Sequence, residues 1–363
     1  MTAPLLTNRV PLAPQTTRPG VLFAGNFYSA EGGSLSVCEE LSGRLADSGW
    51  PVITVSRWRD PVRKLGEMVG TAWRKRAQYR VAQIDLFSGA AFTWAEAVAW
   101  TARRAGRPFV LTLHGGNLPE FAARSPHRVR RLLRAAAAVT APSPFLREGM
   151  RPYRDDIIEL PNALSLEAYR YRTRDIASPN IVWVRALHDI YNPVLVPRVL
   201  AQLVGEVPGI KVIMVGPDKG DGSLQRTLQA AASLGVGAHL EFIGGVPKRD
   251  VPALLDRGDI FLNTANIDNA PMSVSEALAS GLCVVSTAVG GIPHLLRDGV
   301  NALLVPADDE MAMAAAVRRV LVEPGLAQQL SRAARARAEA FEWSAILPQW
   351  EQLLASVAGG ARG

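Results

Sequence analysis

Two acidic residues, Asp268 and Glu276, stand eight positions apart in the segment NIDNAPMSVSEALASG, residues 266–281. Pro271 fits the first turn of a helix, which would place Asp268 in the preceding loop and Glu276 on the first helical turns. Ser273 and Glu276 also have the S-x-x-E spacing of a capping box, so a purely structural role for Glu276 stays open. Two carboxylates in these places can accept hydrogen bonds from hydroxyl groups. The pair therefore indicates a ligand with several hydroxyls, such as a sugar or a ribose.

Other polar residues follow apolar runs at points where a phosphate or a sugar could be held. Arg185 ends the run IVWVRA, and its guanidinium matches the paired oxygens of a diphosphate, with a structural ion pair as the alternative. Gly216 and Lys219 follow the run KVIMVG and are a second candidate phosphate or nucleotide site, or a simple turn. His114 ends FVLTLH, where it could donate a hydrogen bond or carry a proton, or be structural.

The segment GNFYSAEGGS, residues 25–34, precedes a helical pattern. Gly32 and Gly33 would let the backbone approach a ligand, and a helix that begins near Ser34 would direct its free N–H groups at an anion. This spacing differs from G-x-G-x-x-G, and a glycine turn capped by Ser34 explains it equally well.

Eleven short apolar runs alternate with helical patterns along the chain, which predicts parallel sheets wound with helices. They are VLFAGN, PVITVS, FVLTLHGG, AAVTAPS, IIELPN, IVWVRA, KVIMVG, EFIGGV, DIFLNT, CVVSTAVGG and ALLVPA. The length of 363 residues favours two domains, and we expect their boundary within residues 164–179. Because ligands of such sheets bind at the carboxyl ends of the strands, two domains that face each other would hold a substrate in a central cleft.

Composition and charge limit the class of protein. With 48% apolar and 20% charged residues the chain reads as globular. No long apolar run and no signal-like N-terminus is seen, so we expect a cytoplasmic location. Residues 1–172 hold 24 Lys/Arg against 14 Asp/Glu, whereas residues 173–363 hold 16 against 19. The basic first half, with aromatic residues between its arginines, suits an anionic membrane surface or a phosphate-rich ligand, or is a solvated helix face. The lone Cys38 and Cys283 indicate neither a disulfide framework nor a zinc site.

Together these residues resemble the GT-B glycosyltransferases, specifically family four, over nearly the whole chain. The most specific part is the acid-x7-Glu segment followed by the run from Glu276 to Asp309, which is similar to the family's donor-binding block. The resemblance implies two Rossmann-like parallel-sheet domains that face a central cleft. Residues 1–172 would bind the acceptor, residues 173–342 would bind a nucleotide-diphosphate sugar, and a helix at about 343–358 would cross back to the first domain.

The same resemblance implies roles for individual residues. Glu276 would hold the ribose hydroxyls, Asp268 the transferred sugar, and His114 would lie near that sugar, while Gly32 and Gly33 would lie close to the diphosphate. The donor-binding set expected in this way is Gly32, Gly33, Arg185, Gly216, Lys219, Lys248, Asp268, Ala270, Pro271, Met272, Ser273 and Glu276. We expect His114, Asp268 and Arg185 to act on the reaction itself. Transfer would retain the anomeric configuration and need no metal or other cofactor.

Two departures from the family pattern matter. Asp268 stands where the family usually has a glutamate, and Ile190 stands five residues after Arg185 where a lysine is usual. We expect Lys219 or Lys248 to supply the missing cation. The acceptor would be a lipid-linked glycan or polysaccharide, with peripheral contact at the inner face of the membrane and no role for nucleic acid. A nucleotide-sugar epimerase of the same fold, and a non-catalytic protein that binds membranes or nucleic acid, remain the alternatives.

Overall fold

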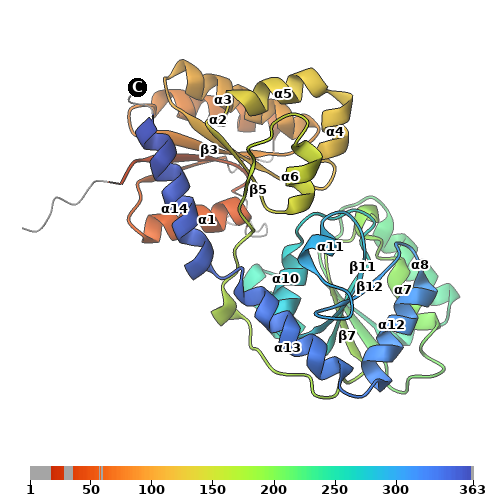
Figure 1. Ribbon diagram of the computed structural model, residues 1–363. Coiled ribbons are helices and arrows are strands. Elements are labelled where there is room, and N and C mark those ends of the chain that lie inside the picture. Colours follow the sequence, from red (N-terminus) through yellow and green to blue (C-terminus); the bar gives the residue numbers. More distant parts are fainter. Residues whose placement is uncertain (1–17, 28–35, 57, 59, 361–363) are drawn as a thin grey trace, which may run out of the picture.

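The computed structural model describes residues 18–27, 36–56, 58 and 60–360, and its strands form two parallel six-stranded sheets (Figure 1). The strand order is β2-β1-β3-β4-β5-β6 in the first sheet and β12-β11-β10-β7-β8-β9 in the second. The first sheet consists of β1 (Val21–Ala24), β2 (Val52–Val55), β3 (Val81–Leu86), β4 (Phe109–Leu113), β5 (Ala138–Ala141) and β6 (Ile158–Glu159). The second consists of β7 (Asn180–Val184), β8 (Lys211–Val215), β9 (Leu240–Gly244), β10 (Ile260–Asn263), β11 (Cys283–Thr287) and β12 (Leu303–Val305). This arrangement confirms the predicted fold of two Rossmann-like domains.

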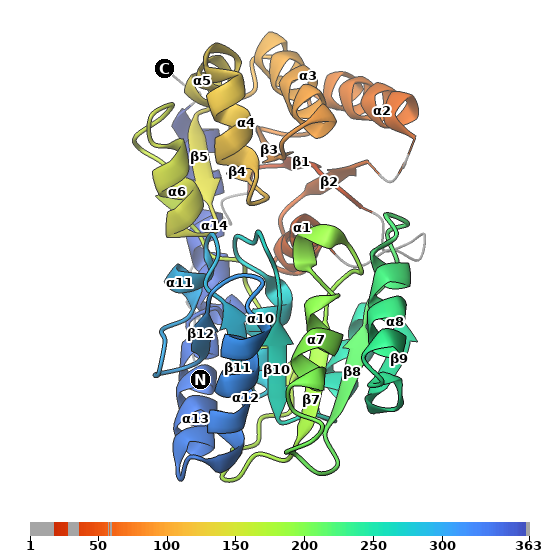
Figure 2. The ribbon, with the colours of Figure 1, turned by 90° about the vertical axis from the view of Figure 1, so that its right-hand side faces the viewer.

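Helices connect the strands and cover both faces of each sheet (Figures 1 and 2). The first domain has α1 (Val37–Asp47), α2 (Pro61–Arg74), α3 (Ala90–Arg104), α4 (Leu118–Arg124), α5 (Pro126–Ala135) and α6 (Pro144–Met150). The second has α7 (Leu195–Ala201), α8 (Ser223–Ser233), α9 (Val251–Leu255), α10 (Met272–Ala279), α11 (Ile292–Leu295), α12 (Glu310–Val322) and α13 (Leu326–Glu339). Short 3-10 turns lie at Leu166–Ala168, Asp189–Tyr191, Gly237–His239 and Lys248–Asp250.

Alternate side chains of the central strands enter different cores. In β1, Val21 and Phe23 pack on the side of α1, whereas Leu22 and Ala24 pack with Met68 on the side of α2 and α3. All of these side chains are buried. Because both faces of the sheet are covered, its strands are apolar on both faces, as expected for parallel sheets.

The strand β3 was missing from the predicted series. Its sequence VAQIDL carries Gln83 and Asp85, yet all six residues are buried between β1 and β4. The polar groups are satisfied inside the fold, since Gln83 Nε2 donates to Asp85 Oδ1 at 3.0 Å and to Thr112 Oγ1 at 2.7 Å. Two polar residues in a short run concealed a central strand.

The last helix, α14 (Trp343–Gly359), packs against the first domain although the second domain precedes it in the chain (Figure 1). Trp343 Nε1 donates to Glu40 Oε1 of α1 at 2.8 Å, and Trp50 Nε1 donates to Glu351 Oε1 of α14 at 2.8 Å. The chain thus crosses between the domains twice, once at residues 160–179 and once at the start of α14.

Helix α1 begins later than predicted. Its N-cap is Ser36, whose side chain accepts from Glu39 N, and Glu39 reaches back to Ser36 N in a capping box. The expected start near Ser34 is therefore wrong. The predicted phosphate loop with Gly32 and Gly33 lies outside the described residues.

Candidate active site

The loop between β10 and α10 holds Asp268 against the cation predicted for the diphosphate. Arg185, directly after β7, forms an ion pair with Asp268, and its guanidinium lies 4.3 Å from the centre of the Tyr191 ring. Burial lowers the pKa of the Arg185 guanidinium. Among the described atoms its Nε is buried without a hydrogen-bond partner. A buried donor of this kind is suited to an anionic ligand.

Glu276 lies on α10 and is paired with the candidate lysine of the same domain. The exposed fraction of its side chain is 3%, and its Oε1 accepts from Lys248 Nζ at the start of the 3-10 turn Lys248–Asp250. Burial lowers the pKa of Lys248 to about 8, and the carboxylate of Glu40 opposes this shift. The structure therefore places Lys248 beside Glu276, the residue predicted to bind the ribose, whereas Lys219 is exposed in the loop after β8.

The capping-box interpretation of Ser273 and Glu276 is wrong. Helix α10 begins at Met272, and its N-cap Pro271 makes no side-chain cap. Ser273 is thus inside the helix, and its Oγ is buried without a partner among the described atoms. A capping explanation for Glu276 fails, and an unsatisfied hydroxyl points to a ligand at the beginning of this helix.

Two glycines that the sequence analysis did not single out pack against the backbone of the Asp268 loop. A Cβ at Gly290, which has a φ of +53°, would lie 2.0 Å from Asp268 O, and a Cβ at Gly291 would lie 1.9 Å from Asn269 O. Gly291 N also donates to Asp268 O at 3.0 Å. Only glycine allows this approach, so Gly290 and Gly291 determine where the backbone of Asp268 lies. The GG sequence before α11 is a signal that could have been used.

Gly216 serves the backbone. A Cβ there would lie 1.6 Å from Arg185 O, and its N–H donates to Gly244 O at 2.8 Å. The close approach lets the ends of β7 and β8 meet, and it accounts for this glycine without a ligand. Lys219 N donates to Leu187 O at 3.1 Å, so the loop also holds the chain after Arg185.

In the first domain, His114 follows β4 and is oriented by an acid that the sequence analysis missed. His114 Nε2 lies 3.0 Å from Asp85 Oδ1 of β3, and the imidazole stacks on the Phe87 ring with the centroids 4.8 Å apart. The exposed fractions of the two side chains are 12% for His114 and 5% for Asp85. A carboxylate that contacts Nε2 fixes the orientation of the imidazole and leaves Nδ1 to contact another group. The sequence analysis missed Asp85 because it did not predict the strand β3.

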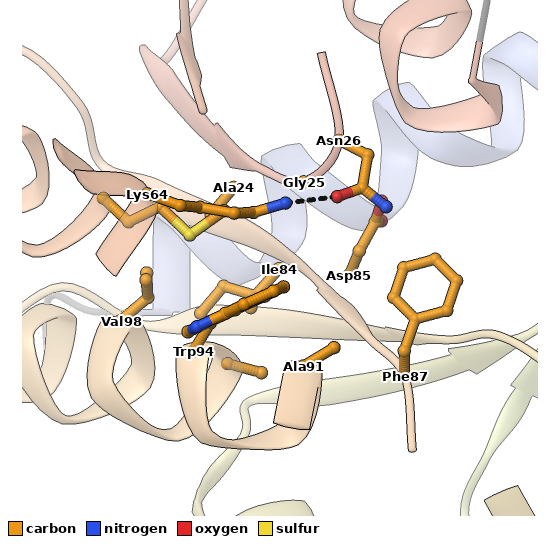
Figure 3. A pocket seen from close by; sticks show the side chains of 12 residues that line it. Ala24, Gly25, Asn26, Lys64, Ile84, Asp85, Phe87, Ala91, Trp94 and Val98 are labelled. Atoms are coloured by element: carbon orange, nitrogen blue, oxygen red, sulfur yellow. Dashed lines mark hydrogen bonds between the residues drawn. The ribbon is translucent and has the colours of Figure 1, made fainter. Parts of the chain in front are cut away.

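Asp85 also lines a pocket beneath α2 and α3 (Figure 3). The cavity volume is about 20 Å³, and its polar lining includes Asn26 and Lys64. Lys64 Nζ donates to Asn26 Oδ1 and lies 4.6 Å from the centre of the Trp94 ring. Through Asp85 this pocket adjoins the histidine of the cleft.

Contacts across the two domains bring His114 and the Asp268 loop to one place. A Cβ at Gly116 would lie 2.9 Å from Ile267 Cγ2 and 3.5 Å from Asp268 O. Ser143 Oγ donates to Asn269 Oδ1, and Asn162 Nδ2 donates to Ala270 O at 3.3 Å. The remaining predicted donor residues, Pro271 and Met272, follow directly at the beginning of α10. The carboxyl ends of the two sheets thus face each other, as the sequence predicted.

Within the described part of the chain, no group of three or more His, Cys, Asp or Glu residues is arranged to hold a metal ion. Nor does any helix there have the length and apolar character needed to cross a membrane. Cys38 and Cys283 are both buried and free.

Comparison with known proteins gives a consistent result. The model of the family "Glycosyl transferases group 1" matches residues 177–337, and that of "Glycosyltransferase Family 4" matches residues 31–168. D-inositol 3-phosphate glycosyltransferases from Mycobacterium ulcerans and Saccharomonospora viridis are both 29% identical, over 179 and 185 residues. These matches cover 47% and 48% of this chain but only 39% and 43% of the relatives, so the chain matches less than half of their length.

Solved structures share the fold at low identity. Sucrose-phosphate synthase from Thermosynechococcus elongatus superimposes with a TM-score of 0.78 at 18% identity, over 94% of this chain and 100% of that one. Anabaena HepE in complex with UDP-glucose has a TM-score of 0.75 at 19% identity, over 93% and 100% of the two chains. With one family model on each domain and the GT-B architecture throughout, the chain belongs to the group 1 glycosyltransferases.

Proposed function

We propose that the protein is a retaining glycosyltransferase that moves a sugar from a nucleotide-diphosphate sugar to a lipid-linked or polysaccharide acceptor. The observation that carries the proposal is the Arg185–Asp268 pair of the second domain, whose loop approaches Gly116, two residues after His114 of the first. Membership of the family supports the reaction class, and the relatives named above are glycosyltransferases by name. HepE binds UDP and UDP-glucose, so uridine nucleotides are the first donors to test here.

The residues present fit a nucleotide-diphosphate sugar. Arg185 Nε and Ser273 Oγ are buried donors that lack a partner among the described atoms, and they lie at the end of β7 and the beginning of α10. Together with the N–H groups at the beginning of α10, they would bind the diphosphate. Glu276 is buried on the same helix and would accept the ribose hydroxyls. Because Lys248 forms an ion pair with Glu276, it is better placed than Lys219 to supply the missing cation.

The chemistry follows from where charge develops. As the bond from the anomeric carbon to the leaving phosphate breaks, negative charge grows on that phosphate, and Arg185 would stabilise it. Asp268 would orient the sugar, and its side chain is one methylene shorter than the family's usual glutamate, so its contact would be set by Arg185 and by the glycines beneath it. The leaving phosphate oxygen would take the proton of the acceptor hydroxyl. His114, held by Asp85, would bind a sugar hydroxyl and keep it in place.

Two linked measurements test the proposal. A thermal-shift screen against UDP, GDP, ADP and TDP sugars should identify one donor that raises the melting temperature, because a ligand that binds the folded state stabilises it by mass action. That donor, incubated with acceptor glycans of the lipid-linked and polysaccharide classes, should give a product whose anomeric configuration, read by NMR, equals that of the donor. An epimerised sugar formed from the donor alone would favour the epimerase. Inversion at the anomeric carbon would overturn the retaining mechanism, and no stabilisation by any donor would overturn the site.

A further inference from the structure

The loop that carries Asp268 is contacted by residues that follow three strands of the first domain. Gly116 follows β4, Ser143 follows β5 and Asn162 follows β6. These strands are neighbours in the first sheet, so their carboxyl ends lie side by side. Each of the three residues contacts the segment 267–270 of the second domain. Accordingly, α6, which follows β5, faces the end of the second domain that carries α10 and α11 (Figures 1 and 2).

The contact made by Ser143 is buried. The exposed fractions of Ser143 and its partner Asn269 are 4% and 7%. Ser143 is the N-cap of α6, and its Oγ accepts from Leu146 N at 3.3 Å. The hydroxyl proton is therefore available to a second group, and Ser143 Oγ donates to Asn269 Oδ1. Breaking a hydrogen bond between two buried polar side chains is costly, because each is left without a partner.

Asn269 in turn holds the acid of the site. Asn269 N donates to Asp268 Oδ1 at 2.9 Å, while Arg185 pairs with Asp268 Oδ2. One peptide further along, Asn162 Nδ2 donates to Ala270 O at 3.3 Å. Because the peptide that follows Asp268 carries the N–H bound to its carboxylate, a shift of this peptide would turn the acid. The first domain thus reaches the carboxylate through the backbone of the loop.

The other residues expected to bind the donor belong to the second domain. Arg185 follows β7, and Glu276 of α10 is paired with Lys248. The expected contacts with the diphosphate and the ribose therefore lie within one domain. Asp268, which would orient the sugar, is held by both domains.

We propose that Ser143 and Asn162 are positioning residues, through which the first domain sets the Asp268 carboxylate for sugar transfer. This rests on the proposed function, in which Asp268 orients the transferred sugar. The second domain would bind the nucleotide by itself. The acid would take up its working position only where the first domain, the expected acceptor side, is docked against the loop.

Hydrogen exchange of the free chain tests the positioning without any substrate. In S143A/N162A the backbone amides of residues 266–270 should exchange about tenfold faster than in the wild type, because two hydrogen bonds that hold the segment are lost. The variant N269A removes the Ser143 contact from the other side and keeps the cap of α6, and it should also speed exchange there. The strand β11 (Cys283–Thr287), paired on both sides, should exchange as in the wild type.

Kinetics separates positioning from binding. S143A and N269A should each lower kcat of sugar transfer by about tenfold, because a misplaced acid orients the sugar poorly. UDP, GDP, ADP and TDP lack the sugar, and the one that binds the wild type should bind both variants within about twofold. The double variant S143A/N269A should fall no more than about threefold below either single variant, since both remove the same bond. S143T keeps the hydroxyl and the cap, so it should keep kcat within about threefold.

A control variant accounts for the loss of a helix cap. Asp60 Oδ1 accepts from Arg63 N at the N-cap of α2. D60A should therefore lower the melting temperature as S143A does, and it should keep both kcat and the exchange of residues 266–270 at the wild-type level. Thermal melting also shows whether each variant is folded.

Three results would overturn the proposal. They are wild-type exchange of residues 266–270 in both S143A/N162A and N269A, fully additive losses of kcat in S143A/N269A, and a loss of nucleoside-diphosphate affinity as large as the loss of kcat. A wild-type chain that transfers no sugar would instead refute the proposed function. The exchange measurement would then still decide whether the first domain positions the loop.

Discussion

Replacing Glu276 by glutamine tests the centre of the donor site. The change keeps the shape of the side chain but removes the charge that would accept the ribose hydroxyls. Hydrogen bonds to a charged group are worth about 1.5–3 kcal/mol, so the Kd of the donor should rise roughly 10- to 150-fold. The fold should tolerate the change at a cost of about 1 kcal/mol, because the partner Lys248 keeps 30% of its side chain exposed and its ammonium can be hydrated.

Calorimetric titration of the nucleoside diphosphate and of the donor sugar measures this effect directly. Because the ribose contact is equal in the ground state and the transition state, KM should rise and kcat should stay close to the wild-type value. The control is Glu241→Gln, an exposed glutamate of the same domain that is paired with Arg257. If Glu276→Gln binds the donor within twofold of the wild type, or lowers kcat while leaving the Kd unchanged, the assignment of Glu276 to the ribose is wrong.

Three further changes examine other parts of the site. Asp85→Asn should lower kcat by about tenfold or more with little effect on donor affinity, because it alters the group that orients His114, while Gln83, which also donates to Asp85, keeps Thr112 Oγ1 as a partner; a rise in donor KM alone would contradict this. Gly290→Ala should destabilise the fold by roughly 1–3 kcal/mol in denaturant titration and weaken donor binding, since its Cβ would meet Asp268 O at a positive φ. The control Gly299→Ala also has a positive φ but open space around its Cβ, so it should lose stability and keep its donor affinity. Folding lowers the pKa of Lys248 to about 8 from its usual 10.5. Between these pH values the unfolded state holds more protons, so the free energy of unfolding should rise with pH across that window. In Lys248→Met this rise should be flatter, and an unchanged slope would refute the pKa shift.

Much of the candidate donor site could be predicted from the sequence because its signals are local. Arg185 and Asp268 follow apolar strands and Glu276 lies on the helix after the second of these, and the parallel-sheet rule then places strand ends together. The capping-box hypothesis failed because spacing alone does not say where a helix begins. Pro271 takes the N-cap position, so Ser273 falls inside α10 and keeps its hydroxyl for another partner.

The two wound sheets, the family and the residues that end the strands could be predicted from the sequence, since apolar periodicity and short spacings are properties of neighbours along the chain. Contacts between residues far apart in the chain became known only from the folded structure. Asp85 reaches His114 only because β3 lies beside β4, and Lys248 reaches Glu276 across 28 positions. The contacts of Gly290 and Gly291 with the Asp268 loop likewise arise only once the chain has folded, because contact depends on every element that packs around a residue.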